Sequence, residues 1–111
     1  MRMKEPLCYQ ECDRRLWIRA RQIMRDMTAT VWQSRRVRRR AFMVLVNMWI
    51  RDRFHLSRPP KKGLRLHIHG HHCGPGIGGP DAGPPIDALD HACKCHDDCY
   101  GRVRGSTDGD A

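Results

Sequence analysis

The feature that most restricts the fold of this chain is a run of sixteen residues, Gly70 to Pro85, that contains six glycines and four prolines. Proline lacks a backbone donor and fixes φ, whereas glycine is costly to order in a helix or strand. We therefore expect a tightly turning loop with an exposed backbone. Regular structure must lie before residue 70 or after residue 85.

Two amphipathic helices are predicted before the loop, because apolar residues recur there at helical steps of three and four. We expect Ser34 to cap the second helix and Pro59-Pro60 to end helical structure. The apolar faces are formed by Leu16, Ala20, Ile23, Met27 and Val31 in the first helix and by Val37, Ala41, Val44 and Met48 in the second.

Two further elements flank the loop. Apolar and polar residues alternate from Leu64 to Ile68, which is typical of a short strand. After the loop, residues 86–100 predict a helix that ends near Gly101, with Asp87 and Asp90 in its first turns, where the helix dipole favours carboxylates. The expected fold class is mainly α, a small disulfide-linked helical domain with a glycine-rich loop.

The charge is divided unevenly along the chain. Residues 1–62 carry 17 Lys and Arg against 5 Asp and Glu, and residues 63–111 carry 4 against 7, so their net charges are +12 and −3. We therefore distinguish a basic helical N-terminal segment, 1–62, from a second segment, 63–111. The basic segment predicts a nucleic acid or an anionic lipid surface as partner. The contacts would come from Arg35, Arg36, Arg38, Arg39 and Arg40.

The six cysteines allow two interpretations. An even number in a short chain is compatible with disulfides formed in an oxidising compartment. Cysteines interleaved with histidines could instead bind zinc. His67, His69 and His71 alternate and are expected on a solvated strand face. The zinc candidates are Cys73, Cys93, Cys95, His96 and Cys99 with His67, His69, His71 and His72.

Membrane and export signals are weak in this sequence. The longest apolar run, Ala41 to Ile50, is shorter than the roughly 20 residues of a membrane span. Residues 1–13 lack the apolar core of a signal peptide. Neither a membrane-spanning class nor a clear N-terminal signal is predicted.

The residues that carry chemistry lie in the loop and in the helix after it. A glycine loop exposes backbone carbonyl oxygens, and calcium binds about six to eight oxygens. Three carbonyls and one bidentate carboxylate would form such a site. His96 and Asp97 are neighbours, about 100° apart around the helix axis, so both can face the loop. An imidazole beside a bound cation suits hydrolysis, because it can accept a proton from water near neutral pH.

The stretch from Gly70 to Tyr100 resembles the phospholipase A2 superfamily. The loop form is similar to that of compact viral and bacterial members, whereas the cysteines are similar to those of the secreted enzymes. The loop alone is weak evidence, but the loop and the helix together, in this order and spacing, make a specific match over less than a third of the chain. The matching strings are His72-Cys73-Gly74-Pro75-Gly76 and Asp87-x-x-Asp90-x-x-Cys93-x-x-His96-Asp97-x-Cys99-Tyr100.

The resemblance implies a role for each matched residue. His96 would be the general base that activates water, and Asp97 would bind calcium through both carboxylate oxygens. Tyr100 would hydrogen-bond the carboxylate that orients His96. The reaction would be hydrolysis of the sn-2 ester of a glycerophospholipid. Calcium would also bind the backbone carbonyls of His72, Gly74 and Gly76, the Gly74 amide would help to hold the oxyanion, and Cys73 would pair with Cys93.

The chain departs from the family after this helix. Family members continue with a second, antiparallel helix, which carries the aspartate that orients the histidine and usually the partner of the cysteine matching Cys99. Here fifteen residues follow His96, too few for that helix. The chain is then a fragment, or its N-terminal half supplies the orienting group, or activity is weak or absent. If the N-terminal helices take that place, Cys8 or Cys12 could pair with Cys95 or Cys99.

Two classes of function are therefore predicted. The first is a calcium-dependent, phospholipase A2-like enzyme that is secreted and acts on phospholipid at a membrane surface. The second is a basic His/Cys metal-binding module that binds nucleic acid through its arginine-rich helices. Metal identity separates them, because the first requires calcium on oxygen and the second zinc on sulfur.

Overall fold

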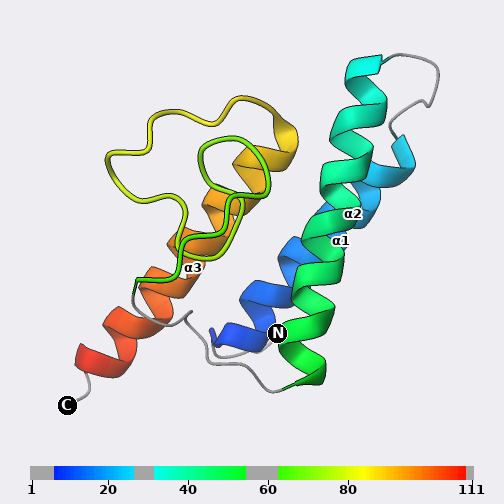
Figure 1. Cartoon of the computed structure of the whole chain (residues 1–111). Coiled ribbons are helices and arrows are strands. Elements are labelled where there is room, and N and C mark those ends of the chain that lie inside the picture. Colours follow the sequence, from blue (N-terminus) through cyan, green and yellow to red (C-terminus); the bar gives the residue numbers. More distant parts are fainter. Residues whose placement is uncertain (1–6, 27–31, 55–62, 110–111) are drawn as a thin grey trace, which may run out of the picture.

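The computed structural model describes residues 7–26, 32–54 and 63–109. This part of the chain contains three helices and no strand: α1 is Tyr9–Asp26, α2 is Trp32–Arg53 and α3 is Ala88–Gly109. Helix α1 packs against both α2 and α3, and the segment from residue 63 to residue 87 lies along α3 (Figure 1). The prediction of a mainly α, disulfide-linked domain is confirmed. None of the described helices is long and apolar enough to cross a membrane.

Helix α1 buries the face that its sequence predicts. Leu16, Ala20 and Ile23 are buried, and Cys12 extends the same face by one turn. The predicted positions Met27 and Val31 lie outside the described residues. Because α1 contacts two helices, its buried side chains form the centre of the molecule.

Helix α2 buries Ala41, Val44 and Leu45 against the core. It begins at Trp32, so Ser34 is its third residue and the predicted cap at Ser34 is wrong. The first turn already includes residues 32 and 33, which places Ser34 beyond the position at which a side chain can cap. The predicted stop at Pro59-Pro60 lies outside the described residues.

Helix α3 begins at Ala88, after Asp87, whose carboxylate accepts a 2.9 Å hydrogen bond from the Asp90 amide and so caps the first turn. The prediction that α3 ends near Gly101 is wrong, because the helix continues to Gly109. Each helical glycine costs about 1 kcal/mol relative to alanine. Burial of Val103 in a cluster with Leu7 and Tyr9 opposes that cost.

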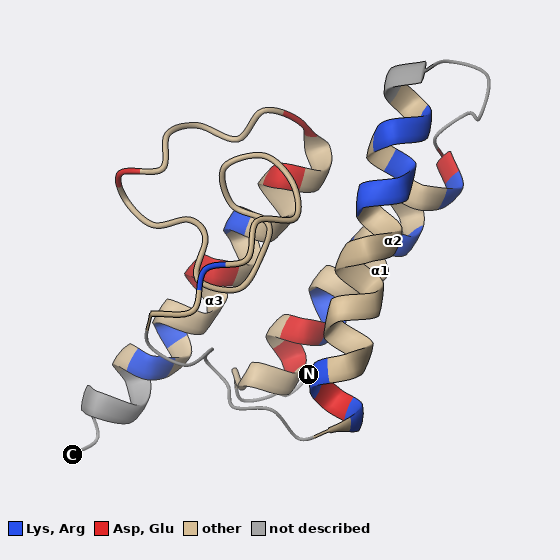
Figure 2. Ribbon diagram, viewed as in Figure 1, with Lys and Arg blue, Asp and Glu red and all other residues tan. Residues whose placement is uncertain are grey.

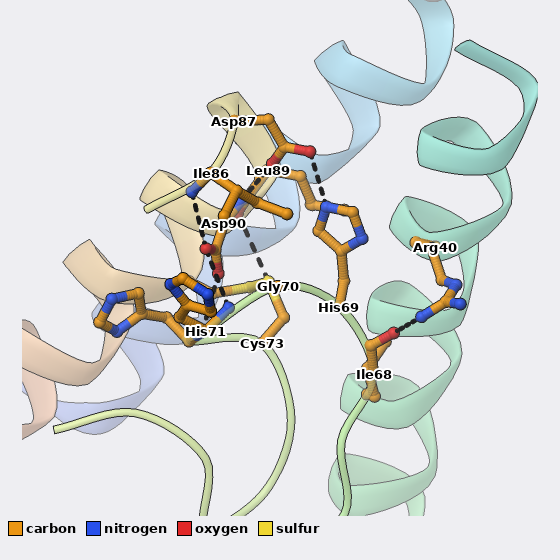
Figure 3. A network of polar contacts seen from close by, with 12 residues as sticks. Arg40, Ile68, His69, Gly70, His71, Cys73, Ile86, Asp87, Leu89 and Asp90 are labelled. Carbon is orange, nitrogen blue, oxygen red and sulfur yellow. Dashed lines mark hydrogen bonds and ion pairs between the residues drawn. A yellow bond between two sulfur atoms is a disulfide. The ribbon is translucent and has the colours of Figure 1, made fainter. Parts of the chain in front are cut away.

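The segment that precedes α3 is irregular, as the glycines and prolines predict. The predicted strand at residues 64–68 is wrong: the segment donates hydrogen bonds from Leu66 to Pro75 and from Ile68 to Cys73, but only an isolated bridge, His69 with Cys73, forms. His69 is also not solvated. It is buried, and its Nε2 lies 2.7 Å from Asp87 Oδ2 (Figure 3).

Asp90 holds the irregular segment to the start of α3 (Figure 3). Its side chain is fully buried and accepts hydrogen bonds from the amides of His71, His72 and Ile86 at 2.8–3.0 Å. Burial opposes ionisation, but the three backbone donors outweigh it and hold the pKa of Asp90 below its usual value. Gly70 packs directly on this carboxylate, because a Cβ at Gly70 would lie within 2.7 Å of both carboxylate oxygens.

The hydrophobic core draws on both charge segments. Leu16, Ala20 and Val44 from the basic segment pack in one cluster with Leu89 and Cys93 of α3. Arg40 of α2 also donates a hydrogen bond to the Ile68 carbonyl (Figure 3). Basic residues gather on the first half of α2 (Figure 2). The basic segment is therefore part of the same packed unit as the glycine-rich loop.

Candidate functional site

The centre of the candidate site is a hydrogen bond between α3 and α1. His96 Nε2 lies 2.7 Å from Asp13 Oδ1, and both side chains are largely buried. Asp13 is a residue of the N-terminal segment, 83 positions before His96 in the chain. The N-terminal half thus supplies a carboxylate to His96, which is one of the three alternatives that the sequence left open.

A disulfide next to Asp13 holds the two helices together. Cys12 bonds Cys99, with 5.8 Å between their Cα atoms. Tyr9, one turn earlier on α1, packs its ring at a tilt against that of Tyr100, one position later on α3, with 4.7 Å between ring centroids. Residues later in α1 therefore contact residues earlier in α3, so the two helices run antiparallel in this region. An antiparallel helix beside α3 is what we expect if the N-terminal helices take the place of the second helix of the family.

Tyr100 binds the same carboxylate oxygen as His96. Its hydroxyl donates a 2.7 Å hydrogen bond to Asp13 Oδ1, and its ring centroid lies 4.4 Å from that of His96. Tyr100 is buried. The expected link between Tyr100 and the carboxylate that contacts His96 is therefore present, with Asp13 as the carboxylate.

The two nitrogens of His96 have different surroundings. With Nε2 directed at the Asp13 carboxylate, the proton of a neutral imidazole resides on Nε2, and Nδ1 is left as an acceptor. Nδ1 lies 3.9 Å from Asp97 Oδ1. Burial lowers the pKa of His96, but its interactions with Asp13 and Asp97 outweigh burial and raise that pKa above its usual value.

Asp97 has one oxygen without a partner. Within the described residues, Asp97 Oδ2 is buried and accepts no hydrogen bond. A Cβ at Gly78 would lie 2.6 Å from this oxygen, so the glycine loop passes directly over it. Burial raises the pKa of Asp97, against the lowering effect of His96 and His72. A buried carboxylate oxygen beside exposed backbone is a suitable ligand for a cation with a preference for oxygen.

The backbone carbonyls that are predicted to bind a cation belong to the loop that passes over Asp97. The Gly74 carbonyl accepts a 3.1 Å hydrogen bond from Ile77 and keeps a second lone pair. Glycine is required at positions 74 and 76, because a Cβ would collide with the backbone carbonyls of Leu66 and Leu64 and because both residues have positive φ. The loop residues thus fit a hard cation held by Asp97. Sequence analysis did not single out Gly78, which lies closest to that carboxylate oxygen among the loop glycines.

A single cleft of about 880 Å³ brings the predicted site residues together. Helix α2 contributes Val44, Asn47, Met48 and Arg51 to its wall, so the basic segment forms part of the cleft. The six residues predicted from the resemblance all line it: His72, Gly74, Gly76, His96, Asp97 and Tyr100.

The cysteines bear on the zinc alternative. Cys73 bonds Cys93, as the resemblance implies, with 5.1 Å between their Cα atoms. Cys99 is also in a disulfide, so three of the proposed zinc ligands carry no thiolate; Cys8 and Cys95 are free. Among the described residues, no three His, Cys, Asp or Glu side chains are grouped so that they could share a metal ion.

No family model matches this chain, and no solved structure matches it significantly. The interpretation of the cleft therefore depends on its own geometry and on the resemblance of the motif.

Sequence analysis missed Asp13, which is the most informative residue of the site. A signal was available, because Asp13 directly follows Cys12, and a disulfide from Cys12 to α3 brings its neighbour to the same place. The pairing of Cys12 rather than Cys8, and with Cys99 rather than Cys95, could not be chosen from spacing alone.

Proposed function

We propose that this protein is a calcium-dependent, phospholipase A2-like hydrolase of the sn-2 ester of glycerophospholipids. The observation that carries the proposal is the shared carboxylate of Asp13, which contacts both His96 and Tyr100 beside an Asp97 oxygen that has no partner among the described residues. A buried histidine with one nitrogen fixed and the other open to a cleft is suited to act as a general base.

The roles of the protein groups follow from this geometry. Asp13 holds the Nε2 proton of His96 and keeps the ring in one orientation. Nδ1 then accepts a proton from a water molecule in the cleft, and Asp13 stabilises the imidazolium that forms. Because water is the nucleophile, the products are a lysophospholipid and a fatty acid, without an acyl-enzyme.

The calcium ion would be held by Asp97 and by backbone carbonyls of His72, Gly74 and Gly76. When bound, it would supply positive charge for the developing oxyanion, and the Gly74 amide is the proposed additional donor. Asp97 supports this assignment because its buried oxygen has no partner among the described residues and faces the loop at Gly78.

We further propose that the substrate is presented at an anionic lipid surface, contacted by Arg35, Arg36, Arg38 and Arg39. The fifth arginine of the predicted set, Arg40, is half-buried and instead donates a hydrogen bond to the Ile68 carbonyl. Arg35, Arg36, Arg38 and Arg39 are exposed on α2, and exposed apolar side chains, including Phe42 and Trp49, follow them on the same helix. Basic and apolar groups together favour an interfacial location. Secretion is part of this proposal, and the two disulfides are compatible with it.

The test is release of a labelled sn-2 fatty acid from phospholipid vesicles, with calcium and with a chelator. We expect calcium-dependent release by the wild type and by His91→Gln, an exposed histidine of the same helix, and none by His96→Gln. If folded, calcium-binding protein releases no fatty acid, the enzymatic proposal is rejected. Salt-sensitive binding of RNA or DNA through the α2 arginines would then favour the nucleic-acid alternative.

A further inference from the structure

The cleft carries positive charge beyond the groups needed for hydrolysis. Arg51 lines it from α2, and Lys94, Arg102 and Arg104 line it from α3. None of these side chains has a role in the proposed reaction. Lys94 already pairs with Asp98, and Arg51 has an interaction of its own, which leaves Arg102 and Arg104 as the charges that a ligand could complement.

The position of Arg104 follows from helix geometry. It comes seven residues after Asp97, which is two turns and about 10 Å along the axis on nearly the same face of α3. Long helical side chains lean toward the N-terminus, so the Arg104 side chain leans back toward Gly101 and Asp97. Gly101 has no side chain, and a Cβ there would meet nothing within 4 Å. The wall between Asp97 and Arg104 is therefore open.

Two of the three acidic residues that line the cleft, Asp13 and Asp98, are already engaged. Asp98 pairs with Lys94 at 2.9 Å, and Asp13 binds His96 and Tyr100. Asp97 faces the loop. Within the described part of the chain, neither Arg102 nor Arg104 forms an ion pair, and both are exposed.

Helix α2 adds to the same charge. Arg51 lies on the cleft side of α2, whereas its neighbour Asp52 is exposed and does not line the cleft. On α3, the arginines of the cleft follow Gly101, while the carboxylates of Asp97 and Asp98 precede it.

We infer that this end of the cleft, lined by Arg102 and Arg104 of α3, selects phospholipids whose head group is negatively charged. The arginines attract an anionic head group and repel the quaternary ammonium of choline. Both effects favour the anionic lipid over phosphatidylcholine. The inference rests on the proposed function, because it assigns the substrate class of the same cleft. It concerns selection inside the cleft and is separate from adsorption through residues 35–40.

The test uses single short-chain lipids, so that no surface is present. Non-hydrolysable sn-2 amide analogues of dihexanoyl phosphatidylglycerol and dihexanoyl phosphatidylcholine are titrated below their micelle concentrations into calcium-loaded protein, and Kd is measured by NMR. We compare the wild type with Arg102→Gln/Arg104→Gln. The matched control is Arg21→Gln/Arg25→Gln, which removes the same charge from exposed positions on α1 outside the cleft.

The wild type and the α1 control are expected to prefer the phosphatidylglycerol analogue, and the α3 double variant is expected to lose most of that preference. The loss should reach up to about fivefold for each arginine, the range of a single exposed ion pair. Equal affinity of the wild type for the two analogues, or a preference that survives in the α3 variant, overturns the inference.

Hydrolysis of the corresponding esters separates this inference from the proposed function. If the analogues bind with the expected preference but the esters are not hydrolysed, the enzymatic proposal fails and the head-group site is supported. If the esters are hydrolysed without a head-group preference, the reverse holds. If neither analogue binds, the cleft does not accept phospholipid and both are rejected.

Discussion

Asp13 and His96 are 83 residues apart in sequence and share a hydrogen bond of 2.7 Å. The bond joins the first described helix to the last and lies beside the Cys12–Cys99 disulfide. The adjacent residues Cys12 and Asp13 of α1 thus contact Cys99 and His96, which lie on adjacent turns of α3. The candidate site is built from both ends of the described fold.

Asp13→Asn should reduce hydrolysis without unfolding the protein. The amide keeps the shape of the side chain but no longer carries the charge that stabilises a protonated His96. We expect the rate of hydrolysis to fall by at least about tenfold. The fall should not exceed the roughly 10²- to 10⁴-fold that a positioned general base contributes. Initial rates, the melting temperature and calcium affinity are measured together. An unchanged rate contradicts the role of Asp13, and the variant combined with His96→Gln should be no worse than His96→Gln alone.

Loss of the Cys12–Cys99 disulfide should destabilise the fold strongly. The bridge spans 87 residues of sequence, so Cys12→Ser/Cys99→Ser should lower the free energy of unfolding by about 3–5 kcal/mol. The control is Cys8→Ser/Cys95→Ser, which removes the free cysteine one turn before each bridged one and should have little effect. Urea unfolding gives both values. Peptide mapping without reductant that found Cys8 or Cys95 bridged instead would contradict the assignment.

Asp97→Asn should abolish calcium binding while leaving the calcium-free protein as stable as before, or more so. The folded protein raises the pKa of Asp97 through burial, which means that it disfavours the charged form. A neutral amide removes that penalty. Thermal unfolding with calcium and with chelator measures both effects. A large drop in melting temperature without calcium would show that Asp97 has a structural role.

Gly78→Ala and Gly79→Ala separate backbone strain from contact with Asp97. The two glycines have nearly equal φ, +109° and +111°, so alanine strains both backbones alike. Only at Gly78 would the new Cβ approach Asp97 Oδ2, whereas nothing lies within 4 Å at Gly79. We expect Gly78→Ala to weaken calcium binding by roughly 10- to 100-fold relative to Gly79→Ala, as measured by calorimetry. Equal affinities would place the cation away from Asp97.

The start of α1 should be sensitive to acid through Glu11. Its carboxylate binds Arg14 at 2.7 and 2.9 Å and Arg15 at 3.2 Å, and these contacts lower its pKa from 4.5 to about 2. The stabilising contribution is therefore complete above pH 4.5 and is lost as the pH falls toward 2. Carboxyl NMR titration should give the lowered pKa. Glu11→Gln should make stability less dependent on pH in this range, and a midpoint near 4.5 for Glu11 would contradict the contacts.

Local patterns predicted much of this fold. The steps between Leu16, Ala20 and Ile23 indicated the buried face of α1, and the glycine and proline content indicated the irregular segment. Patterns failed where distant contacts decided the outcome. Gly101 did not end α3, because Val103 packs against the first residues of the described chain, and His69 was withdrawn from solvent by Asp87.

The candidate site was predictable only in part. Its residues in the loop and in α3 were proposed because the motif fixes their spacing along the chain, and the structure brings them to one cleft. Asp13 was missed because no local spacing relates residue 13 to residue 96, and only a choice among cysteine pairings could have connected them. Gly78 was missed because its importance depends on one close approach to Asp97.

The antiparallel contact between α1 and α3 has a consequence for the order of events during synthesis. Chains emerge from the ribosome N-terminus first, so Asp13 is exposed long before His96 exists. The two earlier helices can pair as soon as both are made, but the carboxylate has no imidazole to hold until α3 has followed. The nascent polypeptide therefore carries an incomplete dyad until α3 has been made, and the proposed lipolytic activity would arise only when α3 docks on α1.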